Sequence, residues 1–192
     1  MKKLLILLCV MLVASSSFAI IEPDDNMMGF YFDQDADTPI IYDIPAFSVV
    51  TMYLTLVNPT FNYLYGFEAG FDMSGEAMAL SVVYTNPHVI DIGEMGNHIV
   101  GFGEPTPMQA ANILSTYTFL YSDADACDPV EFFMHGTIPS SLDPAYPTVL
   151  LEGDELMSMG VSDWYGVTSA FYGDCVVPTT ETSLGSIKSL YR

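Results

Sequence analysis

Residues 50–75 read VTMYLTLVNPTFNYLYGFEAGFDMSG and contain two consecutive stretches with a period of two. In the first stretch, 50–57, apolar side chains alternate with Thr and Tyr up to the turn Asn58-Pro59. In the second, 65–73, aromatic, Ala and Met side chains alternate with Gly, Glu and Asp up to Ser74-Gly75. Alternation in stretches rich in β-branched and aromatic residues, bounded by turn residues, predicts two β-strands that each bury one face.

Similar short stretches recur on both sides of this pair, while helix signals are nearly absent. We predict further strands over residues 27–32, 78–85, 97–102, 112–121, 130–137, 148–152, 155–161 and 167–172. About ten short strands separated by Asn-Pro, Asp-Pro and Gly turns indicate a β-sandwich or a barrel. The stretch 113–121 could hold a short helix instead of a strand. We expect one all-β domain, an antiparallel β-sandwich.

The central segment 46–73 also carries a resemblance to a known family. It has an alternating strand, a short turn and then a second strand that begins Gly66-Phe67-Glu68 and continues with an apolar residue. This layout resembles the opening of cohesin-like and related immunoglobulin-like sandwich modules. The resemblance covers about one sixth of the chain. It implies an immunoglobulin- or cohesin-like sandwich, and cohesins bind partner modules.

The N-terminus has the layout of a secretion signal. Lys2 and Lys3 precede the apolar run Leu4–Val13, and Ser17 and Ala19 place small residues at a cleavage site. Such a run is too short for a stable membrane span, which needs ~20 apolar residues. We therefore predict a signal peptide over 1–19, a sandwich domain over 20–179 and a C-terminal tail over 180–192. The expected location is secreted, periplasmic or cell-surface, with no membrane span after cleavage.

Charge excludes several classes of partner. The chain has 24 acidic and 4 basic residues. Because Lys2 and Lys3 lie in the signal, the mature chain keeps 2 basic residues against 24 acidic ones, a net charge of −22. Such a surface repels nucleic acid and anionic membranes, and suits divalent cations or basic partners.

Two cysteines, Cys127 and Cys175, remain after the signal is removed. In an oxidising compartment an even pair predicts a disulfide. It would close a loop of 48 residues. Such a loop closure stabilises a fold by roughly 3–4 kcal/mol. The alternative is two reduced thiols.

Motifs for catalysis are scarce. The sequence contains no Gly-x-Ser-x-Gly, no His-Glu-x-x-His, no phosphate loop and no dinucleotide fingerprint. His88, His98 and His135 are scattered and lack zinc-site spacings, so we interpret them as loop or strand-end residues. Acidic residues are plentiful, but no pair stands out as the two carboxylates of a glycoside hydrolase. We expect a protein that is not an enzyme, with an acid-pair hydrolase as the least favoured alternative.

The segment Asp33-Gln34-Asp35-Ala36-Asp37 is the best candidate for a metal site. Hard cations take several carboxylate oxygens from a flexible loop, so Asp33, Asp35 and Asp37 are candidate Ca²⁺ ligands. The loop lacks the Gly and Glu of an EF-hand. Asp123, Asp125 and Asp128 form a second acidic group. Solvated turns are the alternative for both.

The C-terminus holds both basic residues of the mature chain, Lys188 and Arg192. They interleave with Ile187, Leu190 and Tyr191. This end, Leu184–Arg192, resembles the Trp-Gly-x-Ile/Val-Lys-x-Leu-Tyr-Arg end of a family of small secreted bacterial proteins. Leu184 stands where that family has Trp. We expect Lys188, Tyr191 and Arg192 to mediate an interaction, either with an acidic receptor or with the acidic body of the protein itself.

These observations favour an exported protein that mediates protein interaction or surface assembly in the cell envelope or outside the cell. The alternative is a calcium-assisted carbohydrate-binding module. Its aromatic side chains for stacking on sugars would be Phe61, Tyr63 and Tyr65, with Trp164 and Tyr165.

Overall fold

The computed structural model describes residues 22–123, 127–163 and 166–175. They form thirteen strands and one short 3-10 helix. In chain order these are β1 (Met27–Tyr31), β2 (Ile40–Ile44), β3 (Val49–Val57), β4 (Tyr63–Ser74), β5 (Ala77–Tyr84), β6 (Val89–Asp91), β7 (Asn97–Pro107), β8 (Ala111–Tyr121), β9 (Val130–His135), β10 (Thr148–Leu150), η1 (Glu152–Asp154), β11 (Leu156–Ser158), β12 (Gly160–Val161) and β13 (Ser169–Gly173).

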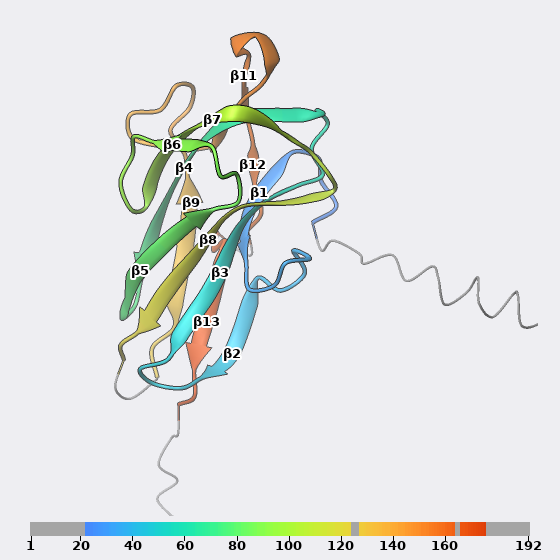
Figure 1. Ribbon diagram of the computed structural model, residues 1–192. Helices are drawn as coiled ribbons and strands as arrows, with labels where there is room; N and C mark the ends of the chain where they lie inside the picture. The colour runs from blue at the N-terminus through green and yellow to red at the C-terminus, as the bar shows by residue number, and fades with distance from the viewer. Residues whose placement is uncertain (1–21, 124–126, 164–165, 176–192) are drawn as a thin grey trace, which may run out of the picture.

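The strands form two packed sheets (Figure 1). The five-stranded sheet has the order β12-β1-β3-β8-β5. The eight-stranded sheet follows the path β11-β10-β4-β9-β13-β2, with β7 paired to β4 and β6 paired to β7. Most pairs are antiparallel, but β1 runs parallel to β12 and β2 runs parallel to β13. The expected antiparallel β-sandwich is confirmed, with a parallel pair near one edge of each sheet.

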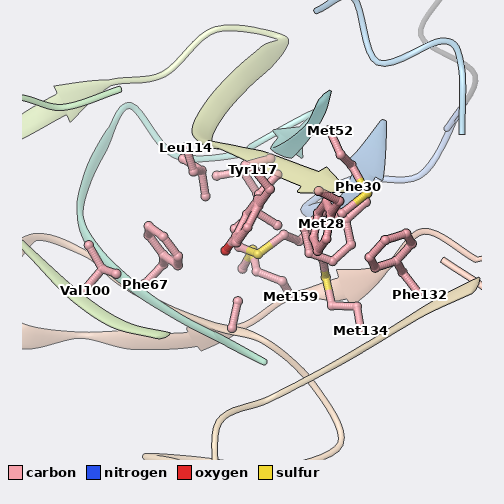
Figure 2. Close-up of a cluster of buried hydrophobic side chains, with 14 of the residues drawn as sticks. Met28, Phe30, Met52, Phe67, Val100, Leu114, Tyr117, Phe132, Met134 and Met159 are labelled. Atoms are coloured by element: carbon pink, nitrogen blue, oxygen red, sulfur yellow. The ribbon is translucent and has the colours of Figure 1, made fainter. Parts of the chain in front are cut away.

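The core lies between the two sheets, as the alternation in residues 50–75 predicts. Met52 and Leu54 on β3 are fully buried, and so are Leu64 and Phe67 on β4. Figure 2 shows how side chains from the two sheets meet in this layer. The ring of Phe30 lies 5.6 Å from that of Tyr117 and 6.0 Å from that of Phe132, centroid to centroid. Such edge-on and tilted aromatic pairs stabilise a core beyond the area that they bury.

The stretch 113–121, where a short helix was the alternative, is part of the continuous strand β8. It pairs with β3 on one side and with β5 on the other. Two strands were not predicted, β2 and β6, and the single strand predicted over 155–161 is instead two strands, β11 and β12, in different sheets. The predicted signal (1–19) and tail (180–192) lie outside the described residues, so the domain boundaries remain predictions. No helix among the described residues is long and apolar enough to cross a membrane.

Candidate functional site

The outer face of the eight-stranded sheet carries an apolar hollow of about 450 Å³. One row of paired residues runs across five strands at this hollow. In this row Leu156 pairs with Leu150, Leu150 with Gly66, Gly66 with Gly101 and Gly101 with Ile90. Two glycines thus lie between large aliphatic side chains. We call this hollow the trough.

Strand periodicity sets which side chains face the trough. Phe67 and Val100 follow the two glycines in register and are buried in the core. Successive side chains on a strand point to opposite faces, so Gly66 and Gly101 face outward. In the next outward row Glu68 pairs with Ile99, and the backbone N–H of Ile92 donates to the carbonyl oxygen of Ile99. The trough is therefore mainly aliphatic, with the carboxylate of Glu68 and the hydroxyl residues Ser141 and Thr148.

The two glycines differ in the space around them. A Cβ on Gly66 would lie 2.5 Å from the carbonyl oxygen of Val100, so no larger residue fits there without moving the backbone. A Cβ on Gly101 would meet nothing within 4 Å. The missing side chain at Gly101 leaves the floor of the trough open.

The side chains that form the walls of the trough are apolar, yet they are exposed to solvent. Ile90 is 69% exposed and Ile92 is 75% exposed, although both are large aliphatic residues in or beside a strand. Leu156 on the opposite wall is 40% exposed. Contiguous exposed apolar surface that is rimmed by polar groups marks interaction sites in natural proteins. The volume of the trough lies within the ~300–1,000 Å³ of ligand-binding clefts.

Glu68 is held at the trough by the loop that follows β9. Its carboxylate accepts hydrogen bonds from the backbone N–H of Ser141 at 2.9 Å, from the Ser141 hydroxyl, and from the Thr137 hydroxyl at 3.3 Å. Glu68 is half-buried. A carboxylate that is fixed in place beside apolar walls favours a ligand that combines a cation with apolar groups.

Behind β6, Asp91 points away from the trough and fixes this strand to the sandwich. One carboxylate oxygen, Oδ1, accepts the backbone N–H groups of Gly93 at 2.9 Å and Ile99 at 3.2 Å. The other, Oδ2, lies 2.7 Å from His98 Nδ1 and accepts the Tyr84 hydroxyl. Because Asp91 stands between Ile90 and Ile92, these bonds hold the exposed wall of the trough in position.

The electrostatics of this group follow from burial and hydrogen bonding. Burial acts to raise the pKa of Asp91, but the hydrogen bonds from Tyr84, His98 and the Gly93 N–H outweigh it, and the pKa is lowered. Burial, and then the hydrogen bond to Asp91 and its charge, raise the pKa of Tyr84 well above its ordinary value. The carboxylate is therefore the stable form of Asp91 in the fold.

The predicted calcium loop lies between β1 and β2. Asp33 Oδ1 accepts the backbone N–H groups of Asp35 and Asp37, both at 3.0 Å, so this oxygen shapes the turn. Asp33 Oδ2 and Asp37 Oδ1 are shielded from water and have no hydrogen-bond donor among the described residues. Within the described ranges, no three His, Cys, Asp or Glu side chains are grouped as a metal site. The calcium site stays a prediction.

In the second acidic group, Asp123 Oδ2 accepts the backbone N–H groups of Cys127 at 2.8 Å and Asp128 at 2.9 Å. Asp123 is buried, while Asp125 lies outside the described residues. The Cα atoms of Cys127 and Cys175 are 4.5 Å apart, with the sulfurs at bonding distance. This spacing suits a disulfide.

The structure separates the three histidines. His98 is the second residue of β7, at the strand end where the sequence placed it, but it is buried at 1% exposure. His88 follows the turn at Asn86, whose side chain accepts its backbone N–H. His135 ends β9, with its Nε2 3.8 Å from Asp72 Oδ2. The three do not converge on one site.

The remaining candidates are only partly described. Tyr63, on β4, is 51% exposed, and Tyr65 is half-buried on the same strand. Trp164 and Tyr165 lie outside the described residues. The tail residues Lys188, Tyr191 and Arg192 also lie outside them.

Sequence reasoning missed the trough. Ile90 and Ile92 flank Asp91, and periodicity alone would bury the isoleucines and expose the carboxylate, the reverse of what the structure shows. The one available signal was this Ile-Asp-Ile alternation after the turn Asn86-Pro87. The sequence does not show which of these side chains face the core and which face solvent.

Comparisons with known proteins bear on the fold. No protein-family model matches the chain, and no curated protein matches its sequence significantly. Solved structures do match. The sixth cohesin of scaffoldin B from Acetivibrio cellulolyticus, in complex with a mutant Cel5 dockerin, is similar at a TM-score of 0.55 and 12% identity, over 78% of this chain and 99% of that one. The third ScaB cohesin of R. flavefaciens, in complex with a group 1 dockerin, is similar at a TM-score of 0.51 and 9% identity, over 79% of this chain and 97% of that one. These matches show a cohesin-like β-sandwich.

Proposed function

We propose that this chain is a non-enzymatic protein-binding module and that the trough is its binding surface. The row Leu156, Leu150, Gly66, Gly101 and Ile90 carries this proposal. It builds an apolar depression out of five strands of a rigid sheet. Surfaces on strands position a partner more accurately than surfaces on loops.

The composition of the trough supports a protein ligand. Its centre lacks charge apart from Glu68, and exposed acidic residues lie at its edge in the turn between Leu150 and Leu156. A desolvated apolar centre inside a polar rim is the usual layout of a protein interface. The hydrogen bonds of Asp91 fix β6 before a partner arrives, which lowers the ordering cost of binding.

The fold is consistent with this role. The two cohesins that the sandwich resembles were both solved in complex with dockerins. The proposal extends this behaviour to a partner protein of the present chain, without specifying a dockerin. With the N-terminal signal layout, it places the module in the cell envelope or outside the cell.

A site-specific photo-crosslinker tests the proposal. A benzophenone amino acid at Ile92 should form adducts with a protein in the exported fraction of the host. The matched control is Val83, which is 64% exposed on β5 of the other sheet. Adducts of one defined mass from position 92 and none from position 83 are expected. Equal patterns from both positions, or none from either, would overturn the assignment of the trough.

A further inference from the structure

The basic and acidic residues of this chain are strongly separated along the sequence. The four basic residues are Lys2, Lys3, Lys188 and Arg192, so the described residues 22–123, 127–163 and 166–175 contain none. Without the first 19 residues, every cation therefore lies in the last five. The end Ile187-Lys188-Ser189-Leu190-Tyr191-Arg192 alternates these cations with large apolar side chains.

The trough has the complementary chemistry. Aliphatic side chains from β6, β7, β10 and β11 form its walls, and Glu68 contributes a carboxylate. Glu152, Asp154 and Glu155, all exposed, occupy the turn between Leu150 and Leu156, and exposed Glu94 follows Ile92. A ligand with apolar groups and two cations would satisfy the walls and the acidic edge together.

We infer that the trough binds the C-terminal segment 187–192 of a second copy of this chain. This inference rests on the proposed function, because it names the partner of the same surface. Ile187, Leu190 and Tyr191 supply apolar groups for the open floor at Gly101. Lys188 and Arg192 supply two cations for Glu68 and the acidic edge, and the described part of the chain contains no Lys or Arg that would compete with them.

The geometry favours a second copy over the chain's own tail. Ser74 on β4 and Ala170 on β13 both pair with Glu131, so they stand at the same level of the sheet. Gly66 lies eight residues before that level, and Cys175 lies five residues beyond it in the opposite direction. At ~3.3 Å per residue, Cys175 is roughly 40 Å from the trough along the strands.

The linker is barely long enough for binding within one molecule. Twelve residue steps join Cys175 to Ile187, and a fully extended chain spans at most ~3.3–3.6 Å per residue, or roughly 40 Å. Figure 1 shows the same separation, with β6, β7 and β11 near one end of the sandwich and β13 running toward the other. A linker that only just spans two sites gives a very low effective concentration, so a second molecule competes successfully.

Binding of this kind joins unlike surfaces. The trough of one copy takes the tail of the next, which leaves one free trough and one free tail. Repeated head-to-tail contacts of this kind build open-ended filaments, unless the rotation between successive molecules closes a ring. The full-length secreted protein should therefore form species larger than a dimer as its concentration rises.

Two measurements on the purified secreted protein test the inference. In the first, a fluorescent synthetic peptide of residues 183–192 is titrated with the protein, and its anisotropy is followed. Ile92→Glu should weaken binding at least tenfold, and Val83→Glu, on the other sheet, should leave it unchanged. A peptide carrying Lys188→Glu and Arg192→Glu should bind at least tenfold more weakly. The inference is overturned if Ile92→Glu binds as the original protein does, or if the peptide fails to bind.

In the second, sedimentation velocity follows the mass of the full-length protein with concentration. The mass should rise beyond a dimer, and the K188E/R192E protein should stay monomeric. A monomer at every concentration would overturn binding to a second copy. If the crosslinker at Ile92 then still captures a different protein, the proposed function stands and only the identity of the partner is wrong.

Discussion

Gly66 and Gly101 lie opposite each other in register on β4 and β7, and they hold open a trough between Leu150 and Ile90. Glycine in a strand gives no side chain to pack and costs conformational entropy. Here the open space at Gly101 forms the depression that the proposed binding surface needs, and Gly66 allows the close approach of the Val100 carbonyl beside it.

The two glycines should respond differently to substitution. Gly101→Val fills the trough in open space and adds a β-branched residue to a strand, so the melting temperature should stay within a few degrees while the crosslink from Ile92 is lost. Gly66→Ala forces its Cβ against the Val100 carbonyl and should cost about 1–3 kcal/mol of stability. Thermal unfolding and crosslinking of both variants check this. A Gly101→Val protein that still crosslinks fully at position 92 would contradict the assignment.

Removing the Asp91 carboxylate should destabilise the fold. In Asp91→Ala the Tyr84 hydroxyl and His98 Nδ1 keep their contact with each other, but both lose the carboxylate, and the backbone N–H groups of Gly93 and Ile99 lose their acceptor, which together should cost at least about 2 kcal/mol in denaturant unfolding. Glu94→Ala, three residues away and exposed, is the control and should change little. If Glu94→Ala lowers the stability and Asp91→Ala does not, Asp91 does not hold β6 in position.

The cost of Asp91→Ala should also depend on pH. The folded pKa of Asp91 is lowered, so its contribution is complete above the unfolded value of about 3.9 and is lost as the pH falls through the folded pKa. The stability difference between the original protein and the variant should be constant from about pH 5 to 8 and should shrink below about pH 4. A difference that instead shrinks above neutrality would show that another group carries the effect.

Cys127 and Cys175 should form a disulfide when the protein is kept under oxidising conditions. Mass spectrometry of a non-reduced digest should find the two cysteine peptides linked. The Cys127→Ser/Cys175→Ser protein should be less stable by roughly 3–4 kcal/mol, because the bond closes a loop of 48 residues in the unfolded chain. Equal stability of the reduced and oxidised proteins would show that the bond contributes nothing.

The Asp33 loop should bind calcium. Asp33 Oδ2 and Asp37 Oδ1 lack a donor among the described residues, and a cation would satisfy both. Calcium should raise the melting temperature by several degrees over chelator, and Asp37→Asn should abolish the rise. Asp143→Asn, in an exposed turn, is the control. If calcium has no effect on the original protein, the loop is a solvated turn.

Much of the sandwich could be predicted because its central strands bury one face each. The predicted strand 50–57 is β3 within one residue, and the predicted 65–73 falls inside β4. β2 could not be predicted in the same way. It lies between Pro39 and Pro45, and its partner β13 is about 130 residues away in the sequence. Local patterning carries no signal for such a parallel pairing.

The trough depends on register between distant strands, and this is why the sequence did not reveal it. Leu150 meets Gly66 across more than eighty residues of chain. Alternation shows which residues share a face of one strand, but it does not show which residue lies opposite on the next. The separation of acidic and basic residues, in contrast, follows directly from their positions in the sequence.

The parallel pairs at the sheet edges have a consequence for biosynthesis. β12 forms the edge of the five-stranded sheet beside β1, and β13 lies beside β2, which forms one edge of the eight-stranded sheet. A ribosome or a secretion channel releases the N-terminal strands first. β1 can pair with β3 soon afterwards, but β2 must wait for its partner β13 until about residue 173 has emerged. Until then the backbone edges of β2 are open to chaperones and to other nascent chains.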